Sequence, residues 1–160
     1  MPQVSPRSVT HLSTRRLVRA LDMAVLLGIA DLLGRHADRL PAAPADLVPV
    51  VPRHRWISGH WARALADEGL ALLDDAGQVT HIEAPRRADL AAARRTITTA
   101  TAGLGYPPVV AAYILDSLRA LPALLRDDVS AQSLLFRDST PDALYRENPV
   151  NRYLNAAAPS

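Results

Sequence analysis

The chain has 160 residues, 49% of them apolar, and a formal net charge of +2 from 18 basic and 16 acidic residues. This length and composition predict a folded chain with a buried core and exclude an intrinsically disordered one. Cysteine is absent, which excludes disulfides and thiolate-bound metal, and no apolar run reaches the roughly 20 residues of a membrane span, so we expect a cytoplasmic protein.

The N-terminal third is predicted to be an arm, a helical run and a connector. Residues 1–14 are polar and contain two prolines, so we predict a disordered arm. Helical periodicity follows from residue 15, and Gly28 interrupts its apolar run, as a break between two helices or a close-packing point. Residues 40–52 contain four prolines, which leaves space for at most one helical turn, around residues 45–48.

The next segment has the order of elements that is typical of a winged helix. Pro52 suits the first turn of a helix that runs to about Asp67. The apolar face of that helix is predicted to contain Ile57, Trp61, Ala64 and Leu65. Residues 70–73 and 79–82 then read as two short strands around a turn at 74–77.

The C-terminal half reads as a series of helices. We predict helices over residues 86–103, 107–126 and 130–136, and a further one that begins at Pro149 after an Asn148 N-cap. The predicted fold is therefore mainly α, a helical bundle with a winged-helix-like helix and a small β-hairpin. It comprises the disordered arm 1–14, a winged-helix-like helical lobe over 15–85 and a second helical lobe over 86–160.

Four segments in this order resemble the N-terminal cap subdomain of S-adenosylmethionine (SAM)-dependent C-methyltransferase domains from modular polyketide and mixed polyketide–non-ribosomal peptide synthases. These segments are ALDMAVLLGIADLLGRH, VPRHRWISGHWARALADEGLALLDDAGQVT, YPPVVAAYILDSLRALPALLRDDVSAQSLLF and ALYRENPVNRYLN. The resemblance implies a cap over a beta-ketoacyl chain that an acyl carrier protein delivers to a SAM-binding core. It also implies that Tyr145, Asn148 and Tyr153 face substrate or cofactor. Asn148 as a helix cap and the tyrosines as packing residues remain the structural alternatives.

The chain carries no recognisable SAM motif of its own. Its seven glycines never form a GxGxG run, and the GxG at 103–105 is followed by Pro107 and Pro108. We therefore expect no cofactor to bind this chain alone, with SAM bound in the complete enzyme, and no methyl transfer without the core. Its partners would be that core and an acyl carrier protein.

Two other classes of function stay open. A purely structural module could dimerise or dock neighbouring synthase domains through the apolar Ala24–Leu33 stretch, or the chain could be the remnant of an inactive methyltransferase. A DNA-binding winged helix would use Arg53, Arg55 and Arg63, but Asp74 and Asp75 at the wing tip would meet phosphate, so nucleic acid is the less favoured partner. The five histidines show no metal-binding spacing and are expected to be solvated, His54 among them, and residues 126–128 read as a solvated helix end.

Overall fold

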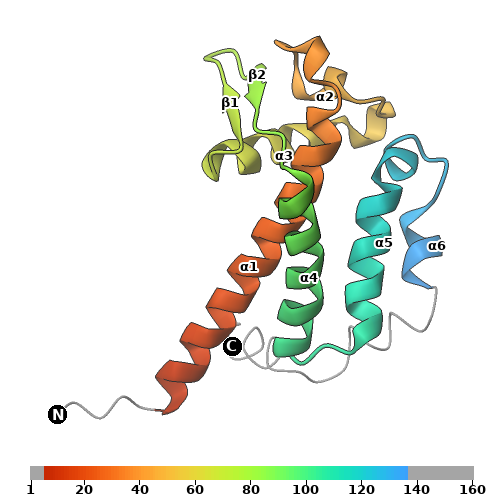
Figure 1. Cartoon of the computed structure of the whole chain (residues 1–160). Helices are drawn as coiled ribbons and strands as arrows, with labels where there is room; N and C mark the ends of the chain where they lie inside the picture. Colours follow the sequence, from red (N-terminus) through yellow and green to blue (C-terminus); the bar gives the residue numbers. More distant parts are fainter. Residues whose placement is uncertain (1–5, 137–160) are drawn as a thin grey trace, which may run out of the picture.

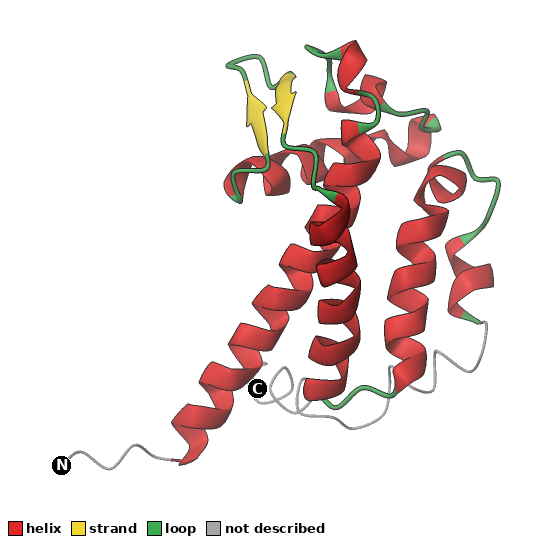
Figure 2. Ribbon diagram, viewed as in Figure 1, coloured by secondary structure: helices red, strands yellow, loops and turns green. Residues whose placement is uncertain are grey.

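The computed structural model describes residues 6–136, which form a mainly helical structure with one small antiparallel hairpin (Figures 1 and 2). The helices are α1 (Pro6–Gly34), α2 (Pro44–Leu47), α3 (Arg55–Asp67), α4 (Arg87–Gly103), α5 (Pro108–Leu125) and α6 (Ala131–Leu135). The strands are β1 (Ala71–Leu73) and β2 (Val79–Ile82), and the 3-10 turns are η1 (Ala37–Arg39) and η2 (Pro52–His54). The predicted fold class is confirmed.

The hairpin, α2 and α3 cap the upper end of α1, as Figure 1 shows. Ala42, between α1 and α2, pairs with Val79 through two backbone hydrogen bonds of 3.1 and 2.9 Å. This bridge adds a third strand position beside β2, which is where a winged helix places its first strand. The hairpin therefore belongs to a winged-helix-like unit.

Three helices end in the same way, with a residue at positive φ and paired backbone hydrogen bonds. Gly69 and Gly105 have φ of 74° and 84° after α3 and α4, and Asp127 has φ of 60° after α5. After α5, the N–H of Asp128 donates to the carbonyl of Ala123, and that of Asp127 donates to Leu124. This is the Schellman pattern, which satisfies carbonyls left free at a helix end. Two of these positions are glycine, which adopts positive φ readily, so the ends of α3 and α4 could be predicted from the sequence.

Two apolar clusters hold the elements together, and α1 contributes to both. The first contains Leu33, Leu47 and Leu65 with the inward residues of the hairpin. The second joins α1, α4 and α5 through the small residues Ala24 and Ala93 and larger partners. The helix α1 also packs along α4, so it links the two clusters.

Two expectations for α1 are corrected. The helix begins at Pro6, so residues 6–14 of the predicted disordered arm are helical. Proline suits a first helical turn because its missing N–H would have no partner there. Gly28 does not break the helix; it is the predicted close-packing point, where an added Cβ would lie 3.1 Å from Leu118 Cδ2. The α5 side chain occupies the space that a larger residue would need.

The short elements agree with their predictions. The proline-rich connector holds only the turn α2, and the hairpin turn is closed by Asp74, whose Oδ1 accepts from the N–H groups of Ala76 and Gln78. Gly77, at φ of 76°, takes the left-handed position of that turn. Ser130 caps α6 by accepting from the N–H of Ser133.

Candidate functional site

The residues predicted to face substrate or cofactor, Tyr145, Asn148 and Tyr153, lie outside the described residues. The helix predicted to begin at Pro149 also lies outside them. Their roles stay predictions.

A cavity of about 320 Å³ lies between α1, α4 and α5. Its wall includes the small residues Ala24, Gly28 and Ala93, which leave space between three helices that otherwise pack closely. Larger apolar side chains complete the wall, among them Leu115 and Leu118 of α5. The volume lies at the lower end of the range of about 300–1,000 Å³ for small-molecule sites.

Four charged residues line the same cavity. Arg35 and Asp31 form an ion pair within α1, with 2.6 Å between Nη2 and Oδ2. Arg119 pairs with Asp116 within α5 at 2.7 Å. Arg94 of α4 also lines the cavity, and no described residue pairs with its guanidinium. The cavity is therefore lined by both aliphatic and charged side chains, and its rim has a net positive charge.

The chemistry of this lining favours binding over catalysis. The residues that line it are aliphatic, proline, arginine and one aspartate, so they offer no hydroxyl or imidazole nucleophile. Within residues 6–136 no group of three His, Cys, Asp or Glu side chains could hold a metal ion. Gly103 is the last residue of α4, and Gly105 follows it at positive φ.

A second polar cluster joins the end of α5 to the start of α3. Asp127 Oδ1 accepts hydrogen bonds from Arg53 Nη2 at 2.6 Å and from His54 Nε2 at 2.8 Å. The Arg53 hydrogen bond is the main reason that the pKa of Asp127 lies below its usual value. The same contact raises the pKa of Arg53. Beside it, the N–H of Val51 donates to the carbonyl of Leu125 at 2.9 Å.

This cluster corrects two expectations. Residues 126–128 were expected to be a solvated helix end, but Asp127 bonds with two residues more than 70 positions earlier in the chain. His54 was expected to be solvated, but its ring contacts that carboxylate and its side chain is 28% exposed. Neither contact has a local sequence signal. None of its residues lines the cavity between α1, α4 and α5.

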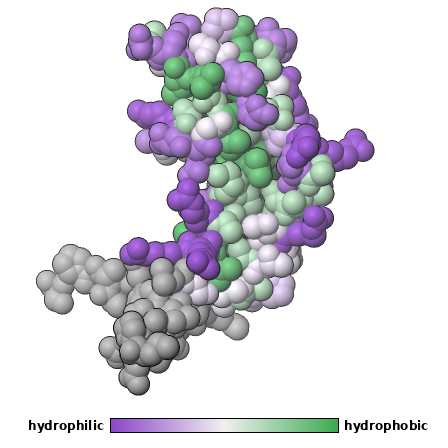
Figure 3. Space-filling view, turned by 60° about the vertical axis from the view of Figure 1, so that its left-hand side comes forward, coloured by the Kyte–Doolittle hydropathy of each residue, from purple (hydrophilic) through white to green (hydrophobic). Residues whose placement is uncertain are grey.

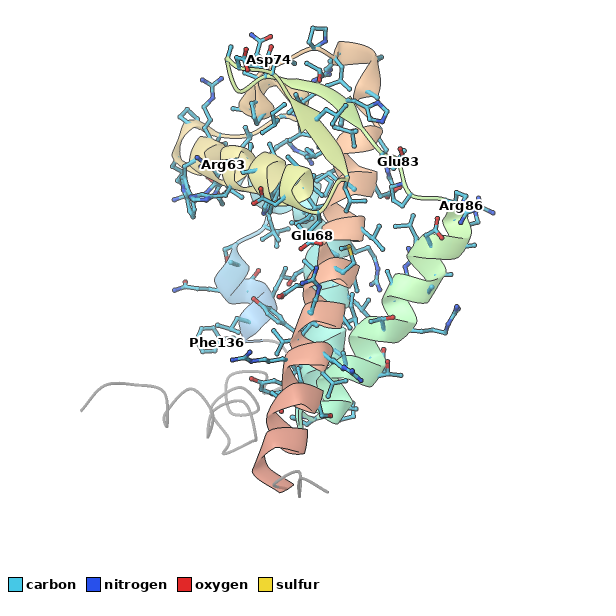
Figure 4. All side chains as sticks on the ribbon, turned by 90° about the vertical axis from the view of Figure 1, so that its left-hand side faces the viewer. Arg63, Glu68, Asp74, Glu83, Arg86 and Phe136 are labelled. Atoms are coloured by element: carbon cyan, nitrogen blue, oxygen red, sulfur yellow. The ribbon has the colours of Figure 1, made fainter. Side chains whose placement is uncertain are left out.

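The surface of α3 was the candidate for nucleic acid. Two of the three candidate arginines have carboxylate partners: Arg53, in η2 just before α3, pairs with Asp127, and Arg55 pairs with Asp46 at 3.5 Å. Trp56 is 64% exposed in the same turn. Figure 4 shows Asp74 at the tip of the hairpin and Arg63 on α3. Paired arginines and an acidic wing tip are poorly suited to bind phosphate.

The predicted apolar face of α3 is rotated slightly from the one observed. Ser58, Ala62 and Leu65 are the buried residues, and Ile57 is only partly buried. Trp61 packs against the first apolar cluster from a partly buried position. The Oγ of Ser58 is buried and has no hydrogen-bond partner in the described structure.

The Ala24–Leu33 stretch was the candidate for a dimer interface. Ala24, Ile29, Ala30 and Leu33 are at most 5% exposed and pack inside the chain. These four side chains are therefore not available to a partner, because the folded chain already covers them.

The helix α5 is apolar but incompletely covered. It is long and apolar enough to cross a membrane, with a mean hydropathy of 1.4, and 17% of its 18 residues are buried. Core helices of water-soluble proteins meet the same criteria of length and composition. Phe136, directly after α6, is 69% exposed (Figure 4). Figure 3 shows a further band of apolar atoms down one face of the molecule, between hydrophilic side chains.

No protein-family model, curated protein or solved structure matches this chain.

Proposed function

We propose that this chain is the N-terminal substrate-capping subdomain of a SAM-dependent methyltransferase from a polyketide or mixed polyketide–non-ribosomal peptide synthase. Four sequence segments support the proposal through their resemblance to such subdomains. The structural observation that supports it is the partial burial of α5 together with the exposed Phe136: 17% of the 18 residues of this apolar helix are buried, most of the others are partly buried, and Phe136 is 69% exposed. Apolar surface of this kind is typical of interfaces, and a methyltransferase core would cover it.

The cap would act on an acyl chain rather than on the cofactor. It would exclude water from the reacting carbon of a carrier-bound beta-ketoacyl chain and restrict the orientation of that chain. Both effects raise a rate without any catalytic group in the cap. The SAM-binding core would hold the cofactor.

SAM binding, measured by calorimetry, tests the proposal. We expect no heat of binding for the 160-residue chain alone. We expect binding when a methyltransferase core is fused to the chain or added as a separate protein. Binding by the short chain alone would refute the division into cap and core.

The contact with the core can be tested at Phe136. The Phe136→Asp variant should weaken association with the core, because it places a charge beside the exposed apolar surface. Leu72→Asp is the matched control: Leu72 is a 60% exposed apolar residue on β1, away from α5 and α6. Equal losses in both variants would argue against an interface at the end of α6.

A docking or dimerisation module is the second candidate function, and the same surface of α5 favours it. Analytical ultracentrifugation separates the two. A mass that rises with concentration, and that Phe136→Asp returns to the monomer value, would support self-association. A monomer mass that does not change with concentration would exclude self-association.

A further inference from the structure

We propose that the cavity between α1, α4 and α5 binds an acyl chain that ends in a single carboxylate. The ligand is a free medium-chain fatty carboxylate or a molecule with that end. This site lies within the described chain and goes beyond the proposed capping function, because it needs neither a methyltransferase core nor a carrier protein.

The apolar wall accounts for the acyl part of the ligand. Ile97 and Leu118 present aliphatic side chains from two helices to a space of about 320 Å³. Small residues at Ala24 and Ala93 keep that space open. An alkyl chain that enters it leaves water for an aliphatic surface, which is favourable in proportion to the apolar area buried.

The arginines at the rim of the cavity explain why the ligand should carry a carboxylate. The number of arginines without a partner explains why it should carry one negative charge. Arg35 is paired with Asp31, and Arg119 with Asp116, so each of these guanidinium groups already has a carboxylate. Arg94 has no described partner. One unpaired arginine beside an apolar cavity is matched by one negative charge on an apolar ligand.

The position of Arg94 on α4 fits this geometry. Residues Leu90, Arg94 and Ile97 are spaced by four and three, so they share one face of the helix, and all three line the cavity. Ile97 is buried, whereas Arg94 is exposed. A ligand whose methyl end lies in the cavity beside Ile97 would therefore place its carboxylate next to the Arg94 guanidinium.

The test uses the 160-residue chain and octanoate, with octan-1-ol as the uncharged control. Binding is followed by amide chemical shifts, which also report where the ligand lies. We expect octanoate to shift the amides of Gly28, Ala93 and Leu118. We expect octan-1-ol to bind about tenfold more weakly, since a charge-assisted hydrogen bond is lost.

Arg94→Gln should lower the affinity for octanoate about tenfold and leave octan-1-ol unchanged. Arg95→Gln is the matched control. Arg95 is also exposed and also accepts a threonine hydroxyl at its carbonyl, but it does not line the cavity.

Equal binding of octanoate and octan-1-ol would overturn the inference, as would equal effects of the two variants. Amide shifts confined to α3 or the hairpin would also overturn it. The proposed capping function has a separate readout, because SAM binding with the core present does not involve octanoate.

Discussion

The contact between Gly28 and Leu118 gives a sharp test of how the three long helices pack. In a Gly28→Ala variant the new Cβ would lie 3.1 and 3.2 Å from the two methyl carbons of Leu118. Such contacts are too short, so Leu118 must move by a few tenths of an ångström. Leu118 lines the cavity of about 320 Å³, which offers the space for that movement.

The expected result is stabilisation. Alanine is favoured over glycine by about 1 kcal/mol in a helix interior, and Gly28 lies well within the 29-residue α1. Because Leu118 can move into the cavity, most of this gain should remain. For a chain of this size, about 1 kcal/mol raises the midpoint of thermal unfolding by roughly 2–4 °C. Thermal unfolding followed by circular dichroism measures the shift.

Gly34→Ala is the matched comparison. Its new Cβ would lie 3.3 Å from Ala84 Cβ and 3.6 Å from Ala84 Cα. Ala84 has no long side chain that could rotate away, and Gly34 is the last residue of α1, where helix propensity contributes least. We expect no gain from this variant. A Gly28→Ala variant that unfolds at a lower temperature than the wild type would refute the reasoning, since it would show that Leu118 is held rigidly.

Three other substitutions probe different parts of the fold. Asp127→Asn should lower stability at pH 7, because it removes the carboxylate that accepts from Arg53 and His54, while asparagine still tolerates positive φ. The pKa of Asp127 is lowered in the folded state, so its contribution is present above the ordinary value of 3.8 and is lost as pH falls through the folded pKa. Urea unfolding from pH 7 down to acid pH should thus show a stability difference between wild type and variant that narrows as the pH falls; a difference of constant size would exclude the charge effect. Leu65→Ala should lower the free energy of unfolding in urea by about 2–5 kcal/mol, because Leu65 is 0% exposed. A loss below about 1 kcal/mol would mean that neighbouring side chains move in to fill the space left by the leucine. Gly77→Ala should cost about 1–2 kcal/mol because of its φ of 76°, and unchanged stability would show that the hairpin turn rearranges.

Local signals predicted most of the elements correctly. Pro52, Gly69 and Pro108 mark helix boundaries through properties of single residues, namely a fixed φ or freedom at positive φ. The hairpin followed from Asp74 and Gly77 between two short apolar runs. Such features act over a few residues, which is why the sequence alone was sufficient for them.

Features that depend on distant contacts could not be predicted in this way. Asp127 takes positive φ without being glycine, and its partners Arg53 and His54 lie more than 70 residues away. The start of α1 was missed because polar residues with two prolines looked disordered, although Pro6 suits a first helical turn. The cavity itself depends on how three helices approach one another, so the spacing of Leu90, Arg94 and Ile97 could not by itself show that Arg94 lies at a cavity.

The hydrogen bond from the Val51 N–H to the Leu125 carbonyl makes one amide proton sensitive to separation of the connector from α5. Val51 belongs to the connector before α3, yet its amide proton is held by the last residue of α5. That proton can exchange with solvent only when the connector separates from α5. Its exchange rate therefore measures the free energy of opening between the winged-helix-like unit and the long helices. A ligand that binds between α1, α4 and α5 would slow this exchange if it also stabilises that junction.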